Sequence, residues 1–307
     1  MSLRFLSSLN SPPIVVATGA VLVAGLPFVQ AGALSLGALK IANLLAFATN
    51  VTAVSIPGRM DGEQDRKMRQ GDLDPELTPL RDSDAENNIV TASRDRTLLA
   101  PAGWAFSIWA PIYVGEAVFV GAQFVDPSLA AAVLPQVTVP FVAANLLQSL
   151  WCASFRPSYA NGWHKYTSVA MLGGTAVALS QVPFGLSIYL LPMTVHFGWT
   201  TAATLVNLNG SIAMGGSVSD STLISTGHAS AVLATGLGVG VTAFHALPAY
   251  GLTIAWALAA CANGMRIKEQ DDSISDVLHA GASVQRSLLL TGSALCMAAS
   301  AFTFTMQ

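Results

Sequence analysis

The sequence predicts an all-α polytopic membrane protein, a helix bundle with about eight or nine transmembrane segments. Of its 307 residues 52% are hydrophobic and only 10% are charged, whereas roughly a quarter of the residues in soluble domains are charged. The mean hydropathy is +0.55. Seventeen of the 31 charged residues lie between 57 and 100, so the rest of the chain is nearly uncharged. One large aqueous loop is therefore expected among membrane-spanning helices.

A membrane-spanning helix needs about 20 mostly apolar residues. Turn signals such as Asp126-Pro127-Ser128 and Pro183-Phe184-Gly185 divide the apolar parts of the chain into segments of about this length. The segment at 167–182 is the shortest. The candidate spans are 13–33, 37–56, 101–123, 131–154, 167–182, 186–208, 222–246, 249–265 and 287–305.

The first segment has two interpretations. Arg4, an apolar stretch and then Val29-Gln30-Ala31 are typical of a secretory signal with a small-residue cleavage site. The same residues could equally form an extra transmembrane helix that is retained. Both readings of residues 1–31 stay open, because either one leaves the topology of the remaining segments unchanged.

The cations predict the orientation of the chain. Arginine and lysine lie in loops 57–100, 155–166 and 266–286, whereas the alternate loops 124–130 and 183–185 carry none. By the positive-inside rule, the three basic loops face the cytoplasm or the equivalent side of an organelle. The net charge of −3 and the absence of a basic cluster argue against a nucleic-acid partner.

The segment that opens at Pro101 carries the strongest functional signal. Trp109, Tyr113 and Glu116 are spaced by three or four residues, so they share one helix face. A central carboxylate costs about 2.5–3.5 kcal/mol in a membrane. Glu116 is therefore expected to face the bundle interior, where it is paired, protonated or in contact with a ligand. The alternative is a packing face on which Glu116 is hydrogen-bonded to a neighbouring helix.

Two further residues refine the expected shape of this helix. Pro111 would lie in mid-helix and deprive the Ser107 carbonyl of its donor, so a bend is expected near that position. Trp104 lies off the aromatic stripe, at the expected edge of the membrane.

Two other segments carry polar side chains on one face. His196, Trp199 and Asn207 share a face of their helix; His196 could be an axial ligand, a proton relay or a satisfied core histidine. Gln148 lies on a second helix, beside Trp151. Amides of this kind often only join membrane helices to one another.

These pieces together resemble the TspO/MBR family, the translocator protein or tryptophan-rich sensory protein group, over residues 37–210. The resemblance rests on three motifs that occur in the family's order. They are Pro101, Gly103, Trp104, Trp109 and Tyr113; Gln148 and Trp151; and Leu191-Pro192, Trp199, Ala203-Thr204 and Asn207. The chain departs from the family pattern in having Gln148 where asparagine is usual, and in its 44-residue loop at 57–100.

The resemblance implies a domain organisation. It implies a five-helix bundle at 37–210 that includes the loop 57–100, preceded by the hydrophobic segment 1–36. Residues 211–307 would add three transmembrane helices to this core.

The resemblance also implies a pocket for flat hydrophobic ligands such as porphyrins or sterols, which the protein would sense, sequester or transfer as a receptor or transport protein. No cofactor is required, although a porphyrin, haem or chlorophyll-type pigment could be bound. The expected ligand-binding residues are Trp104, Trp109, Tyr113, Glu116, Gln148, Trp151, His196, Trp199 and Asn207.

Two alternative functions remain. The chain could be an accessory, pigment-associated subunit of a larger membrane complex, or a homodimer in the bilayer. It could also be a proton-coupled transporter that uses Glu116 and His196. An enzyme is not favoured, because the sequence has no nucleophile–base signature, P-loop or dinucleotide fingerprint; a slow tetrapyrrole-modifying activity stays open. The three cysteines lack metal-binding spacing, so no metal site is expected.

Overall fold

The computed structural model describes residues 11–29, 32, 34–55, 96–154, 159, 162–214, 218–270 and 274–306. Within these ranges all regular secondary structure is helical, which confirms the predicted all-α fold. The α-helices are α2 (Pro12–Gly25), α3 (Leu36–Ser55), α6 (Trp109–Val125), α7 (Pro127–Ala153), α8 (Thr167–Leu179), α9 (Leu191–Ala213), α10 (Asp220–His245), α11 (Pro248–Lys268) and α12 (Asp276–Thr305). Short 3₁₀ helices are η1 (Leu26–Phe28), η4 (Gly103–Ile108), η6 (Gly162–Tyr166), η7 (Phe184–Leu186) and η8 (Ile188–Leu190).

Five helical stretches in the described residues are long and apolar enough to cross a membrane. They are Leu36–Ser55, Gly103–Val125, Pro127–Ala153, Asp220–His245 and Asp276–Thr305. Helices α2 and α8, with 14 and 13 residues, are shorter than a full span. Helices α9 and α11 are long enough, but their polar residues make them less apolar. The predicted loop 57–100 lies outside the described residues up to position 95, as do positions 155–158, 160 and 161 of the loop 155–166.

The chain forms two compact units. The first contains the described residues through Ser55 and the stretch Ser107–Thr204. The second contains the described residues 96–106 and those from Leu205 onward. Each unit is discontinuous in sequence, because residues from the first third of the chain join residues from its later part.

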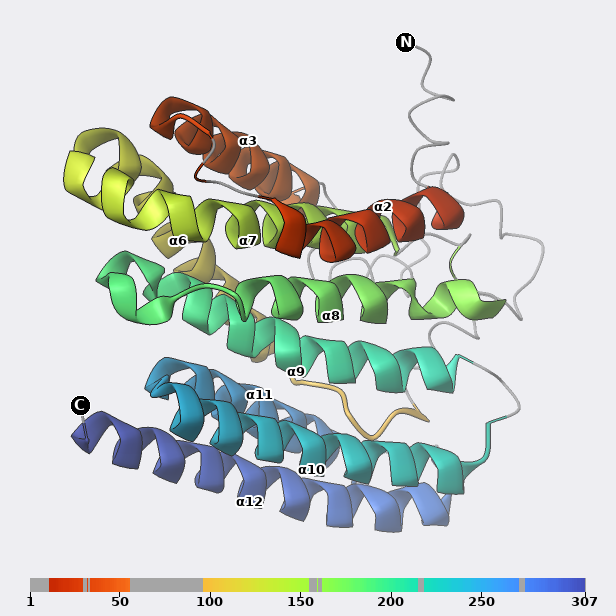
Figure 1. The fold of residues 1–307 in the computed structure, drawn as a ribbon. Coiled ribbons are helices and arrows are strands. Elements are labelled where there is room, and N and C mark those ends of the chain that lie inside the picture. The colour runs from red at the N-terminus through yellow and green to blue at the C-terminus, as the bar shows by residue number, and fades with distance from the viewer. Residues whose placement is uncertain are drawn as a thin grey trace. The chain divides into compact units, whose positions relative to one another are not determined.

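Helix α7 lies at the centre of the first unit. It contacts α2, α3, α6 and α8 (Figure 1). Its start is set by Asp126, whose carboxylate accepts hydrogen bonds from the backbone N–H groups of Ser128 and Leu129. Hydrogen bonds from the Ser128 hydroxyl and the Leu129 N–H lower the pKa of the Asp126 carboxyl below its ordinary value. Phe119 of α6 packs edge-to-face on Phe141 of α7, with ring centroids 5.4 Å apart.

Helix α6 begins later than the sequence predicts. The α-helix starts at Trp109 rather than at Pro101, and the 3₁₀ helix η4 precedes it. Pro111 therefore lies in the first turn, where its missing N–H removes no helical hydrogen bond. The predicted mid-helix position of this proline is therefore wrong, and the backbone changes from 3₁₀ to α between Ile108 and Trp109.

The second unit is built on α10, α11 and α12, each of which packs on the other two (Figure 1). The segment 96–106, here named the strap, runs along α11 through long-range hydrogen bonds. Lys268 donates its ammonium to the Thr97 carbonyl over 2.7 Å, and the Ala102 N–H donates to the Ala260 carbonyl over 3.0 Å. The strap is thus fixed to a helix more than 150 residues away in sequence.

Close packing of α6 on α9 generates a first prediction. A Cβ atom at Gly115 would collide with the Pro192 ring, which cannot rotate away. Gly115→Leu should therefore cost about 1–3 kcal/mol, as overpacking commonly does, and lower the thermal unfolding midpoint in detergent. Gly121→Leu on the same helix is the control, because no heavy atom lies within 4 Å of its added Cβ. An equal loss of stability in both variants would contradict the packing described here.

Candidate functional site

Helices α6, α7 and α9 bring six of the nine predicted site residues together inside the first unit. These residues are joined by hydrogen bonds and ring contacts, and we name them the aromatic–polar cluster. The cluster consists of Trp109, Tyr113, Glu116, Gln148, His196 and Trp199.

The centre of the cluster is a buried pair of titratable side chains. The Nδ1 atom of His196 lies 2.7 Å from the Oε1 atom of Glu116, and both side chains are 0% exposed. Glu116 thus faces the interior and is paired, as its expected cost in a membrane requires. Because one partner comes from α6 and the other from α9, the pair also joins these two helices.

Each member of the pair keeps one polar atom without a partner among the described residues. These atoms are Oε2 of Glu116 and Nε2 of His196. Gln148 likewise has one bonded and one unpartnered polar atom. Its Nε2 donates to the Tyr113 hydroxyl over 2.8 Å, but its Oε1 is buried without a partner among the described residues. A buried polar atom left without a hydrogen bond costs about 1–3 kcal/mol. The three atoms are therefore the natural contact points for a polar group of a ligand, a proton or water.

Trp109 is the hub of the aromatic contacts. Its ring stacks on Tyr113 with centroids 5.5 Å apart and planes inclined by 23°. It also meets Trp199 at 85° and His196 at 79°, with centroids 5.9 and 5.7 Å apart. Centroid distances of 4.5–7 Å correspond to rings in direct contact. These rings therefore leave no room for a flat ligand between them, and Trp109 and Trp199 are only 5% and 3% exposed.

Of the other three predicted residues, one is on α7, one on the later part of α9 and one in the strap. Trp151 is buried on α7, three residues beyond Gln148. Asn207 lies on α9 in the part that belongs to the second unit, eight residues or about 12 Å of helix beyond Trp199.

Trp104 belongs to the strap. Its Nε1 donates to the Asn263 side chain over 3.2 Å, and its ring meets Trp256 edge-to-face with centroids 4.7 Å apart. Trp256 in turn donates its Nε1 to the Ala105 carbonyl over 3.0 Å. These contacts give Trp104 a structural role within the second unit.

Sequence reasoning missed a set of buried amides on α3. Asn43 donates to the Gln123 side chain over 3.0 Å and to the Thr138 hydroxyl over 3.2 Å. Asn50 donates to Asn145 over 2.9 Å. The available signal was the spacing of seven residues between two asparagines in an apolar helix, which places both on one face.

A metal centre receives no support from the described part of the chain, where no three His, Cys, Asp or Glu side chains are grouped to hold an ion. The groups that could hold a tetrapyrrole are the rings of the cluster together with the polar side chains of His196, Glu116 and Gln148.

The chain matches one family model. That model, described as a TSPO-like protein, matches residues 82–292. The matched stretch shares 82–210 with the predicted core and continues through α10 and α11 into α12. No curated protein and no solved structure matches the chain significantly. Because the family model covers more than half of the sequence, the chain belongs to the TSPO-like protein family.

Proposed function

We propose that this protein binds a flat hydrophobic ligand of the tetrapyrrole class at the aromatic–polar cluster, for sensing, sequestration or transfer. The family match and the five apolar spans already make it an integral membrane protein of the TspO type. The observation that carries the proposal is that aromatic rings and unpartnered buried polar atoms occur together in one interior cluster.

The rings supply the apolar part of the recognition. Trp109 and Trp199 are nearly perpendicular, and Tyr113 extends the surface of Trp109 by stacking on it. Small-molecule sites generally combine such aromatic walls with a few polar groups that fix the ligand's orientation. Aromatic contacts contribute about 0.5–1.5 kcal/mol beyond the effect of buried area.

The polar atoms favour a tetrapyrrole over a sterol. Oε2 of Glu116 and Oε1 of Gln148 can accept hydrogen bonds, and Nε2 of His196 can accept or donate according to its tautomer. A tetrapyrrole carries two or more carboxyl groups, which donate a hydrogen bond when protonated and accept one when ionised, so it can make polar contacts with more than one of these atoms. A sterol offers one hydroxyl and would leave at least one of them unsatisfied.

Ring removal tests the ligand site directly. Trp109→Ala and Trp199→Ala should each weaken protoporphyrin binding about tenfold or more, because each removes stacking area. The measurement is a titration in mild detergent followed by tryptophan fluorescence quenching and the porphyrin absorbance band. Trp163→Ala is the matched control, since Trp163 is 56% exposed and lies outside the cluster. Equal affinity in all variants would remove the proposed site.

The ligand class is tested by replacing a polar side chain of the cluster with an apolar one. Gln148→Leu removes the acceptor Oε1 while keeping a similar side-chain volume, so protoporphyrin affinity should fall about three- to tenfold, the range expected for one hydrogen bond. The affinity for a fluorescent sterol, measured on the same preparation, should not change. A loss of sterol affinity without a change in porphyrin affinity would reverse the assignment.

We also propose that the three basic loops face the cytoplasm or its equivalent. Contacts in the second unit support a common side for two of these loops, because both reach the same carboxylate. Arg96 of loop 57–100 donates to one oxygen of Asp220, and Ser275 of loop 266–286 donates to the other. Residues from 57–100 and 266–286 are thereby held at the start of α10, in agreement with the positive-inside pattern.

The sidedness of the loops is checked by introducing one additional cysteine at a time. A membrane-impermeant thiol reagent applied to the non-cytoplasmic side should label His245→Cys, at the end of α10, and not Gln270→Cys, beyond the end of α11. The native cysteines are buried, so the background should be low. The opposite labelling pattern would invert the proposed topology.

A further inference from the structure

We propose that a file of buried polar side chains carries protons through the first unit, with Glu116 and His196 as the proton-exchanging pair. The inference shares this pair with the proposed ligand site, but it concerns a different activity and is measured by a different assay. The members of the file are Asn43 and Asn50 of α3, Tyr113, Glu116 and Gln123 of α6, Thr138, Asn145 and Gln148 of α7, and His196 of α9.

One end of the file lies near the turn between α6 and α7. There the Asn43 amide donates to Gln123 and Thr138, over 3.0 and 3.2 Å. The Gln123 amide donates to the Lys40 carbonyl over 3.0 Å, and the Lys40 ammonium lies 5.7 Å from the centre of the Phe124 ring. Gln123 is three residues from Asp126, the exposed N-cap of α7, so this end is close to the aqueous boundary.

The other end of the file lies near the opposite ends of the same helices. Asn50 donates to Asn145, and three residues further along α7 Gln148 donates to the Tyr113 hydroxyl. Tyr113 is four residues from the start of α6, and Gln148 is five residues from the end of α7. Tyr113 and Gln148 at this end, and Gln123 at the other, are thus within about one and a half helical turns of a helix terminus.

The length of the file distinguishes it from an isolated interhelical hydrogen bond. Ten residues of α6 separate Tyr113 from Gln123, which corresponds to about 15 Å of helix rise. The whole of α6, with 17 residues, is about 26 Å long by the same measure. Separate hydrogen-bonded groups therefore occur at intervals along more than half of α6, and Glu116 lies between the two ends.

Five atoms of the file are buried without a partner among the described residues. They are Asn43 Oδ1, Asn50 Oδ1, Glu116 Oε2, Gln148 Oε1 and His196 Nε2. Water commonly satisfies buried polar groups when several of them can share it. Water held by these amide oxygens on both sides of the carboxyl–imidazole pair would complete a route along which a proton can travel.

The proton balance at the pair is simple. A proton taken up at Nε2 of His196 converts the imidazole to imidazolium. The bridging hydrogen then moves from Nδ1 to Oε1 of Glu116, and the carboxyl releases a proton into the file. One proton enters and one leaves, no electron is transferred, and water-mediated exchange returns the imidazole to its first tautomer. Tyr113, on the same helix face, and Lys40, at the outer end, are the other titratable groups along this route.

Proton flux into proteoliposomes tests the inference. An internal pH-sensitive dye records acidification after valinomycin sets a potassium diffusion potential. The wild-type protein should acidify the lumen at least tenfold faster than empty liposomes. Glu116→Gln and His196→Gln should fall to the empty-liposome rate, because an amide cannot take up or release the proton. Glu116→Gln keeps the size of the side chain and a hydrogen bond to His196, so it should remain folded.

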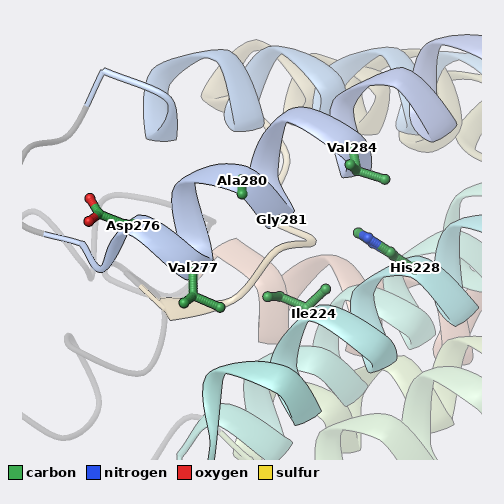
Figure 2. A pocket seen from close by; sticks show the side chains of 7 residues that line it. All are labelled: Ile224, His228, Asp276, Val277, Ala280, Gly281 and Val284. Atoms are coloured by element: carbon green, nitrogen blue, oxygen red, sulfur yellow. The ribbon is translucent and has the colours of Figure 1, made fainter.

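A matched histidine controls for non-specific effects. His228 of α10 also has a side-chain partner, the amide of Gln285 at 2.7 Å, but it belongs to the second unit. Figure 2 shows it beside Ile224 and Val284 at an open groove between α10 and α12. His228→Gln should keep the wild-type flux. If it lowers flux as much as His196→Gln does, the assigned route is wrong.

The route itself is tested by Asn50→Leu, which breaks the contact with Asn145 without touching the pair. Flux should fall several-fold, while protoporphyrin affinity stays unchanged. Normal flux in this variant, wild-type flux no faster than in empty liposomes, or unchanged flux in Glu116→Gln would each overturn the inference. Porphyrin titration of the same preparations separates the two proposals: flux without binding removes only the ligand site, and binding without flux removes only the proton route.

Discussion

The cost of a carboxylate inside a membrane-length helix is the constraint on which the rest of the structure depends. Glu116 is fully buried, and the His196 imidazole at 2.7 Å is what makes its position tolerable. That contact requires α6 and α9 to lie close together, and Gly115, next to Glu116, leaves room for the Pro192 ring. The same approach brings Trp109 against the imidazole ring. One electrostatic requirement thus organises the packing and the chemistry of the cluster.

Local spacing predicted the helices and the cluster well, because both depend on short-range periodicity. The steps of three and four residues from Trp109 to Glu116 placed these side chains on one face, as the structure shows. The start of α6 was mispredicted: residues 101 and 102 lie in the strap, where the Ala102 N–H donates to the Ala260 carbonyl, a long-range contact that no local pattern reveals. The partner of Trp104, Asn263, is 159 residues away, and no local pattern could identify it.

The buried amides of α3 escaped prediction for a different reason. A hydropathy window averages over about 18 residues, so two asparagines among apolar neighbours hardly change it, and α3 still qualifies as a span. Their partners lie on α6 and α7 and become apparent only when the helices are packed. A ligand that reached Oε2 of Glu116 would occupy an atom that the proton route also needs, so the two proposed activities would compete.

The strap makes the two units inseparable as genetic modules. The chain passes from one unit to the other after Ser55, after Phe106 and again after Thr204. A fragment that begins at Leu205 would contain α10, α11 and α12, but Asn263 and Trp256 of α11 would lose their partners from the strap. Recombination at a single point could therefore not transfer the second unit intact to another protein. Evolutionary exchange would have to carry the strap with the later helices.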